Sequence, residues 1–135
     1  MSSPTPAGRT STEVQTVIAW HSALNSGDVE RLIELSHPDV EVGGPRGKAH
    51  GTQILREWVD RANIHLEPER IFHDGDAVVA EQVAEWISTE PSSRQTVASV
   101  FLVRDGLVTS VVRYPGLDDA LRAADLDETQ EIRPE

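Results

Sequence analysis

The chain has 135 residues, no cysteine and a formal net charge of −11 at pH 7. This length is typical of one domain, and a chain without cysteine forms no disulfides and has no thiolate chemistry. The negative charge argues against a nucleic-acid partner and against anionic lipid, because both contacts need clustered Lys and Arg. No apolar run approaches the roughly 20 residues that span a bilayer, so no membrane partner and a cytoplasmic location are expected.

The two ends of the chain differ in composition from its middle. Residues 1–12 contain no apolar leader and are expected to form a disordered lead-in. Residues 127–135 are polar and acidic, and this composition predicts a disordered acidic tail. Residues 13–126 are expected to form a single domain, because no repeat or long linker interrupts them.

Three helices are predicted in the first half of the domain. The first is indicated by side chains at three- and four-residue spacing: Val14, Val17, Ile18, His21 and Leu24. Trp20 lies beside this stripe. Gly27 and Asp28 then end this helix and begin a second, short one. A third helix starts near Thr52 and carries Trp58 on its apolar face.

The second half of the domain changes to a period of two, which is typical of strands. Strands are predicted over residues 65–72, 77–88, 95–104 and 107–114, with Asp-Gly turns or a polar loop between them. A brief strand near residues 40–42 and a last short helix after residue 116 complete the pattern. Helices followed by a meander of strands predict an α+β fold, in which a curved antiparallel sheet packs against the N-terminal helices.

The two faces of the strand over residues 77–87 differ in chemistry. One face carries small residues beside an amide and an indole: Val78, Ala80, Gln82, Ala84 and Trp86. Small side chains leave room, so this face is suited to line a cavity. The other face alternates Val79, Val83 and Ile87 with Glu81 and Glu85. These carboxylates lie about 13 Å apart along the strand, too far to act on one bond, so an outer, solvated or subunit-facing position is expected.

Local signatures of catalysis and of metal binding are absent from the sequence. There is no phosphate-binding glycine loop, no Gly-x-Ser-x-Gly elbow and no His-Glu-x-x-His. The five histidines show no ligand spacing. Neither a metal site nor another cofactor is therefore expected.

Three short segments carry a resemblance to a known family. They are Leu24-Asn-Ser-Gly-Asp28 between the first two helices, His50-Gly51 before the third helix, and the late run from Val100 to Tyr114. In this order and spacing the chain resembles the nuclear transport factor 2-like superfamily, which includes SnoaL-like polyketide cyclases, ketosteroid isomerases and limonene epoxide hydrolases. The resemblance spans roughly residues 13–126. It implies a cone-shaped curved sheet whose mouth is covered by helices, around one internal pocket.

The catalytic side chains of these relatives are missing at the matching positions. The epoxide hydrolases use an Arg, an Asp two residues later and a second Asp on the last strand, where this chain has Gln82, Ala84 and Arg113. The ketosteroid isomerases use an Asp at the end of the first strand and a Tyr on the first helix, where this chain has Gly44 and Trp20. The resemblance therefore implies the scaffold and the pocket without either acid–base mechanism.

The resemblance also implies which side chains face the pocket. The expected ligand-binding residues are Trp20, Trp58, Gln82, Trp86 and Arg113, with Arg113 as the candidate catalytic residue. An unpaired guanidinium in an apolar cone is unfavourable. Arg113 is therefore expected either to form an ion pair with a protein carboxylate or to hold a carboxylate or enolate oxygen of a ligand. Each tryptophan is either a core side chain or a platform for the ligand.

Two functions are consistent with these features. The leading hypothesis is a SnoaL-like protein that binds a small apolar organic ligand, anionic in one version, and that isomerises, cyclises or dehydrates a carbonyl compound. The alternative is a non-catalytic module, either a ligand carrier or a homodimer that associates through the outer face around Val79 and Val83. A homodimer is compatible with both hypotheses, and whether the protein is an enzyme stays open at this point.

Overall fold

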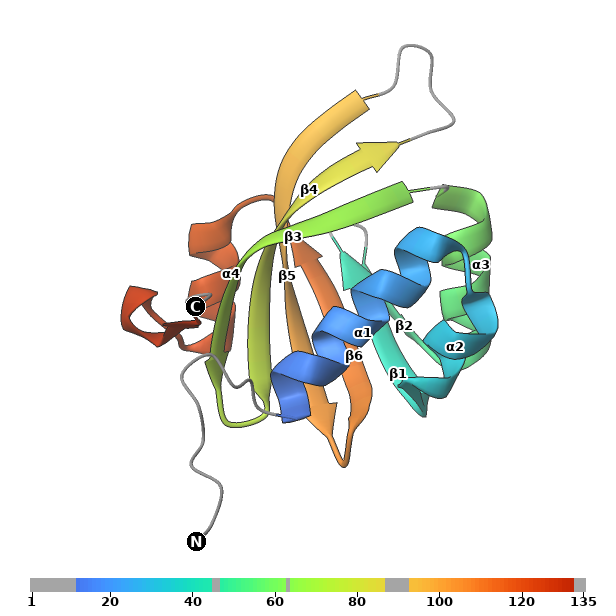
Figure 1. The fold of residues 1–135 in the computed structure, drawn as a ribbon, viewed down its shortest axis with the longest axis horizontal. Helices are drawn as coiled ribbons and strands as arrows, with labels where there is room; N and C mark the ends of the chain where they lie inside the picture. Colours follow the sequence, from blue (N-terminus) through green and yellow to red (C-terminus); the bar gives the residue numbers. More distant parts are fainter. Residues whose placement is uncertain (1–11, 45–46, 63, 87–92, 133–135) are drawn as a thin grey trace, which may run out of the picture.

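The structure is a computed structural model, and it describes residues 12–44, 47–62, 64–86 and 93–132. Four helices and one seven-stranded sheet make up this part of the chain (Figure 1). The helices are α1 (Thr12–Ser26), α2 (Val29–Glu34), α3 (Thr52–Ala62) and α4 (Leu117–Ala124). The strands are β1 (Ser36–Gly44), β2 (Gly47–His50), β3 (Ile64–Asp74), β4 (Ala77–Trp86), β5 (Ser93–Arg104), β6 (Leu107–Tyr114) and β7 (Glu131–Ile132). No helix in these ranges is long and apolar enough to cross a membrane.

The predicted α+β class and the curved sheet are confirmed, but the expectation of a wholly antiparallel sheet is wrong. The strand order is β2-β1-β6-β5-β4-β3-β7, and β1 runs parallel to β6. The chain leaves β1 through the β2 hairpin and α3, enters the sheet again at β3, and reaches β1 only after three antiparallel turns. This pairing joins residues about seventy positions apart, such as Val42 and Val111, and local periodicity does not report it.

Helix α1 crosses the face of the sheet that we call the inner face (Figure 1). Its buried side chains include Val17 and Trp20, both at 0% exposure, and they join a core with Phe101 of β5. Ile18 is 44% exposed, which corrects the prediction that it shares the buried stripe. Because successive helical residues are about 100° apart, placing Trp20 at the centre of the stripe turns Ile18 towards solvent.

An ion pair links helices α2 and α3. Asp28 caps α2, since its carboxylate accepts a hydrogen bond from the Arg31 backbone N–H at 3.1 Å. The Arg56 guanidinium of α3 donates two hydrogen bonds to the Glu30 carboxylate, at 2.9 and 3.1 Å. This arrangement places Leu55 of α3 in the inner core and leaves Trp58 only half-buried, packed against that core.

The opposite face of the sheet, the outer face, is partly covered by α4. Ala120 and Leu121 of α4 pack there on the sheet residues Phe72, Val79, Ala98 and Val100. The prediction of an outer-face association surface was therefore wrong at Val79, which is fully buried within the chain. Ile87, expected on the same surface, lies outside the described residues.

The free edge of β3 is closed by side chains and by β7. The Asn25 amide donates to the Leu66 carbonyl at 2.7 Å and accepts from the Leu66 N–H at 2.9 Å, as a neighbouring strand would. Pro68, two residues on, has no N–H to offer. Beyond a bulge, β7 pairs with Ile71 and Phe72.

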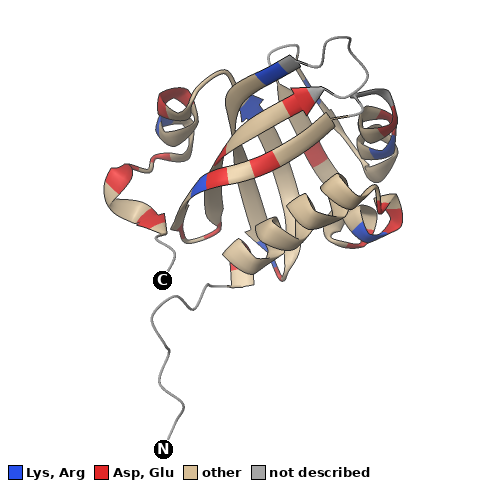
Figure 2. Ribbon diagram, turned by 45° about the horizontal axis from the view of Figure 1, so that its top comes forward, with Lys and Arg blue, Asp and Glu red and all other residues tan. Residues whose placement is uncertain are grey.

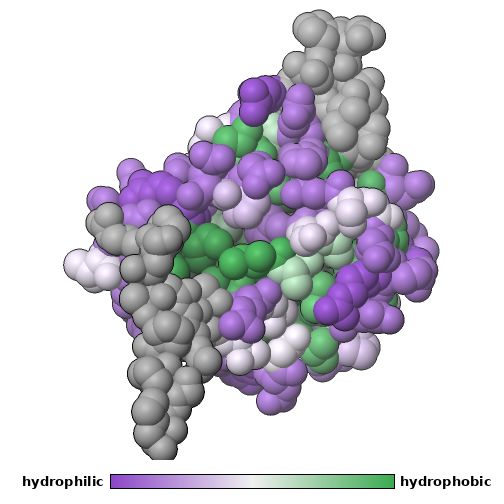
Figure 3. Space-filling model, in the orientation of Figure 1, coloured by the Kyte–Doolittle hydropathy of each residue, from purple (hydrophilic) through white to green (hydrophobic). Residues whose placement is uncertain are grey.

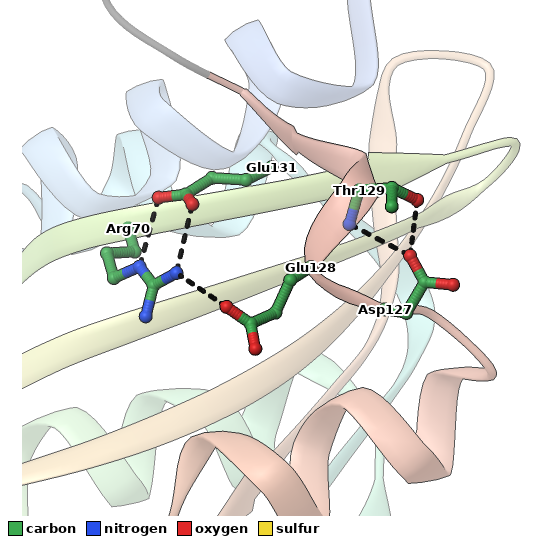
Figure 4. Close-up of polar contacts among 5 residues, drawn as sticks. All are labelled: Arg70, Asp127, Glu128, Thr129 and Glu131. Atoms are coloured by element: carbon green, nitrogen blue, oxygen red, sulfur yellow. Dashed lines mark hydrogen bonds and ion pairs between the residues drawn. The ribbon is translucent and has the colours of Figure 1, made fainter.

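The C-terminal segment differs from the disordered tail that its composition predicts. Residues 128–130 form a 3-10 helix, which Asp127 caps, and β7 follows. The Arg70 guanidinium of β3 binds Glu131 through two hydrogen bonds, at 3.0 and 2.9 Å, and approaches Glu128 at 3.7 Å (Figure 4). We call residues 127–132 and their contacts with Arg70 the C-terminal latch. The bidentate ion pair supplies a local anchor that composition does not reveal.

Candidate functional site

The inner face holds one small cavity beneath α1 and α3. Its volume is about 40 Å³, and it is lined by Trp20, Val42, Trp58, Leu66, Ser99, Val111 and Arg113. Pockets that bind organic ligands usually measure about 300–1,000 Å³, whereas one water takes up about 30 Å³ of liquid volume. Among the described residues, the inner face therefore does not form the roomy pocket that was expected. The core side chains fill most of it.

Arg113 lies at this cavity and has no charged partner among the described residues. It is half-buried on β6, directly across from Ser99 of β5 in the strand register. Burial removes water from the guanidinium and holds the pKa of Arg113 below its usual range. Within the described ranges the guanidinium forms no hydrogen bond or ion pair. Of the two roles expected for Arg113, the ion pair with a protein carboxylate is not seen in this part of the chain.

Gln82 faces inward, as its strand position predicts, but it does not line the cavity. Its side chain is fully buried between α1 and β5. The Ser99 hydroxyl donates to Gln82 Oε1 at 2.9 Å, and Gln82 Nε2 lies 2.8 Å from His21 Nε2. Both ends of the amide are therefore occupied by protein partners rather than being open to a ligand.

His21 closes this buried chain of hydrogen bonds. Its Nδ1 lies 2.8 Å from the Val17 carbonyl oxygen. Burial lowers the pKa of His21 from 6.5 to about 4, and the hydrogen bond to Val17 offsets this only in part. The imidazole is therefore neutral at pH 7. Because both ring nitrogens are engaged, His21 is a structural group rather than a general base.

The tryptophans divide between core and cavity. Trp20 is fully buried, its indole N–H donates to Ser36 Oγ at 3.3 Å, and its ring meets Phe101 edge-on at 5.2 Å. Trp58 stacks on Trp20 with 6.4 Å between ring centroids and an interplanar angle of 21°. Trp58 is half-buried and forms one wall of the cavity. The side chain of Trp86 lies outside the described residues.

Sequence reasoning missed Ser99, the polar cavity residue opposite Arg113. The run Val97, Ser99 and Phe101 alternates with outward-facing residues, and this period of two places a hydroxyl on the inner face. The alternation was readable, but the neighbouring position of Arg113 depends on the pairing of β5 with β6. Glu81 and Glu85 lie on the other face, as expected, and both are only partly buried.

Other hollows lie on the surface and are open to solvent. One groove of about 440 Å³ runs between α1 and β3, with Ile18 and Ser22 on one side and His65 and Glu67 on the other. On the side of the molecule shown in Figure 3, apolar side chains form small groups bordered by polar residues. Helix α1 carries almost no charge, whereas acidic positions mark β3, β4 and the C-terminal latch (Figure 2). Among the described residues, no group of His, Asp and Glu is arranged to hold a metal ion.

The curved sheet, the helices on its inner face and the enclosed cavity define the class of nuclear transport factor 2-like folds. A protein of this class of unknown function from Cytophaga hutchinsonii has a TM-score of 0.70 to this chain, at 14% identity, over 87% of this chain and 97% of that one. TerC co-crystallised with polyporic acid gives 0.69 at 20% identity over 86% and 98%. An epoxide hydrolase from M. tuberculosis, similar to limonene epoxide hydrolase, gives 0.68 at 22% identity over 82% and 87%.

The family follows from the sequence match. The family profile of the SnoaL-like domain matches residues 17–111, which is more than half of the chain, and the protein therefore belongs to the SnoaL-like family. No curated protein matches the chain. Membership of the SnoaL-like family indicates a protein that binds small organic molecules.

Proposed function

We propose that the protein binds a small, largely apolar organic molecule and that Arg113 holds an anionic or carbonyl oxygen of this ligand. One observation carries the proposal: a half-buried guanidinium without a partner in the described chain lies in a cavity walled by two tryptophans. A charge withdrawn from water is unfavourable until an oppositely charged or polar group reaches it. A ligand oxygen would supply that group, and the apolar walls would take the rest of the molecule.

The cavity has to widen before such a ligand enters. Trp58 is a candidate for the wall that moves, because it is half-buried and packs against the core. Its helix contacts α2 through the exposed Arg56–Glu30 ion pair, which is a weak restraint on such a movement. TerC, a protein of the same fold, has been crystallised with an organic acid, which supports a ligand of this class.

Tryptophan fluorescence would test this binding directly. Phenylacetate, 2-naphthoate and polyporic acid would be titrated into the wild type, into Arg113→Ala and into Arg104→Ala as a matched control. Arg104 is exposed and paired with Asp76, away from the cavity. Loss of the charged contact is expected to weaken binding at least about 30-fold in Arg113→Ala only. Equal affinities in all three proteins, or no binding, would remove Arg113 from the site.

Catalysis and carriage are separate versions of this function. Arg113 is placed to stabilise an enolate oxygen, which favours isomerisation, cyclisation or dehydration of a carbonyl compound. However, the described residues that line the cavity include no carboxylate, and this favours a ligand carrier that leaves its cargo unchanged. The exchange of the α-protons of 1-tetralone for deuterium in D₂O separates the two versions. Faster exchange with the wild type than with Arg113→Ala indicates an enzyme, and equal rates with both proteins indicate a carrier.

A homodimer is the remaining part of the proposal. Leu102, on the outer face beyond α4, is 40% exposed and gives that face an apolar contact point. Light scattering during size-exclusion chromatography should report a dimer that Leu102→Glu dissociates. A monomeric wild type at micromolar concentration would contradict the dimer without affecting the ligand site.

A further inference from the structure

The buried hydrogen bonds that link Val17, His21, Gln82 and Ser99 have a direction, which is fixed at the Val17 end. The Val17 carbonyl oxygen can only accept a hydrogen bond, so His21 Nδ1, at 2.8 Å, must carry a proton and donate it. A neutral imidazole has one N–H, and His21 is neutral at pH 7 because burial lowers its pKa to about 4. His21 Nε2 is therefore an acceptor.

Each following member has only one possible orientation. An acceptor at His21 Nε2 requires the NH₂ group of Gln82, and the distance between these nitrogens is 2.8 Å. The Gln82 carbonyl oxygen then faces the other way, towards β5. It accepts the hydroxyl proton of Ser99 at 2.9 Å. The chain thus runs from Ser99 through Gln82 and His21 to Val17 without a free choice at any link.

This direction determines what Ser99 shows to the cavity. A hydroxyl has one proton and two lone pairs, and the proton of Ser99 is committed to Gln82. Turning that proton into the cavity would leave the fully buried Gln82 oxygen without a donor, which is unfavourable. Ser99, itself 2% exposed, therefore offers the cavity an acceptor only.

The acceptor at Ser99 lies beside the cation at Arg113. The two residues are direct cross-strand partners, and side chains of such partners have Cβ atoms about 4.5–5.5 Å apart. The Trp20 indole N–H, the other buried donor at this cavity, is occupied by Ser36. Both residues also line the same cavity, so a ligand in this cavity meets a donor at Arg113 and an acceptor at Ser99.

We infer that the ligand carries a proton-donating group, such as a hydroxyl, next to its anionic or carbonyl oxygen, and that Ser99 selects for this donor. The class comprises hydroxy acids and hydroxyl-bearing carbonyl compounds. The inference rests on the proposed ligand site at Arg113. Within it Ser99 is a specificity residue, while Gln82 and His21 act on the ligand only by fixing the orientation of the Ser99 hydroxyl.

A matched pair of acids tests the selection. Each enantiomer of mandelate and of 2-phenylpropionate would be titrated into the wild type, because these acids differ by a hydroxyl in place of a methyl of similar size. Mandelate is expected to bind about tenfold more tightly, as one additional hydrogen bond provides. In Ser99→Ala the ratio should fall to about one or below, and in Ser99→Thr, which retains a hydroxyl, it should persist.

The ratio separates the inference from the function on which it rests. If both acids bind through Arg113 but with equal affinity in the wild type, or if Ser99→Ala leaves the ratio unchanged, the selection by Ser99 is wrong and the ligand site stands. If neither acid binds, or if Arg113→Ala weakens neither, the site and the selection both fail.

A second measurement needs no ligand and tests the hydrogen-bond chain itself. A long-range ¹H–¹⁵N correlation spectrum shows which ring nitrogen of His21 carries the proton, with its signal assigned from its loss in His21→Gln. A proton on Nδ1 at pH 7 is the expected result. A proton on Nε2 would reverse the chain and turn Ser99 into a donor, and it would overturn the inference whatever the affinities.

Discussion

Two arginines of the same sheet meet opposite surroundings. Arg70, at the β3 edge, is held by Glu131 and Glu128 of the C-terminal latch (Figure 4), and its guanidinium also lies 5.1 Å from the centre of the Phe72 ring. Arg113 lies at the inner cavity, where the described lining residues are apolar side chains, the two tryptophans and the Ser99 hydroxyl. The difference teaches that the ion pairs of Arg70 account for its place in the fold, whereas the proposed ligand site rests on Arg113, which has no partner among the described residues.

The largest expected effect tests whether the cavity region is also the main core. Trp20→Ala removes a fully buried indole that packs on Phe101 and Trp58, and it should lower the free energy of unfolding by roughly 3–5 kcal/mol. Ile18→Ala, on the same helix but 44% exposed, should change it by less than about 0.5 kcal/mol. Urea unfolding measures both. Similar losses would mean that α1 does not bury the face described.

The next effect concerns pH and tests whether His21 is buried in the interior as a neutral group. The pKa of His21 is about 4 in the folded protein, against 6.5 for a solvated histidine, so the unfolded chain binds the proton more tightly. The contribution of His21 to the free energy of unfolding is therefore fully present above pH 6.5. It is lost as the pH drops towards 4, which lowers the free energy of unfolding by roughly 3 kcal/mol. Unfolding of the wild type and of His21→Gln between pH 7 and pH 4 isolates the contribution. Parallel pH curves would show that His21 is not buried as a neutral group.

A smaller effect distinguishes the two arginines by sign. Arg113→Met removes a partly desolvated charge that has no partner in the described chain. It should raise the melting temperature, with a gain of up to about 1 kcal/mol in the free energy of unfolding. Arg70→Met breaks the bidentate ion pair with Glu131 and should lower the melting temperature. Differential scanning calorimetry measures both variants. A loss of stability in Arg113→Met would indicate a protein partner for this guanidinium and would undo the contrast.

The smallest effect is confined to the latch. Glu131→Gln keeps the size of the side chain but removes its charge, so β7 should separate from β3 more often. Amide hydrogen exchange at the paired residues Ile71 and Phe72 should become faster, while exchange at Ser99 stays as in the wild type. Unchanged exchange at Ile71 and Phe72 would show that strand pairing alone holds the latch.

Local patterns predicted the elements and their faces. The three- and four-residue spacing of Val14, Val17, His21 and Leu24 located α1, and the period of two located Gln82 on the inner face. These predictions succeeded because each depends on the geometry of a single element.

Most of what local patterns failed to predict depends on contacts between distant residues, whereas the exposed position of Ile18 depends on its own helix. The parallel pairing of β1 with β6 and the Arg70–Glu131 ion pair, 61 residues apart, are not encoded in any local period. The cavity volume depends on how Trp58 stacks on Trp20, and composition does not determine such packing. The position of Ser99 beside Arg113 depends on the register of β5 against β6, which the spacing along a single strand does not report.

The closure of the β3 edge limits how copies of this protein could assemble. An unblocked sheet edge offers backbone donors and acceptors to which another chain can add a strand. Here the Asn25 amide occupies both backbone groups of Leu66, Pro68 has no N–H, and β7 pairs with the residues beyond the bulge. Growth of a continuous sheet from one molecule into the next is therefore blocked at these positions of the β3 border, and the β2 strand forms the opposite border of the sheet.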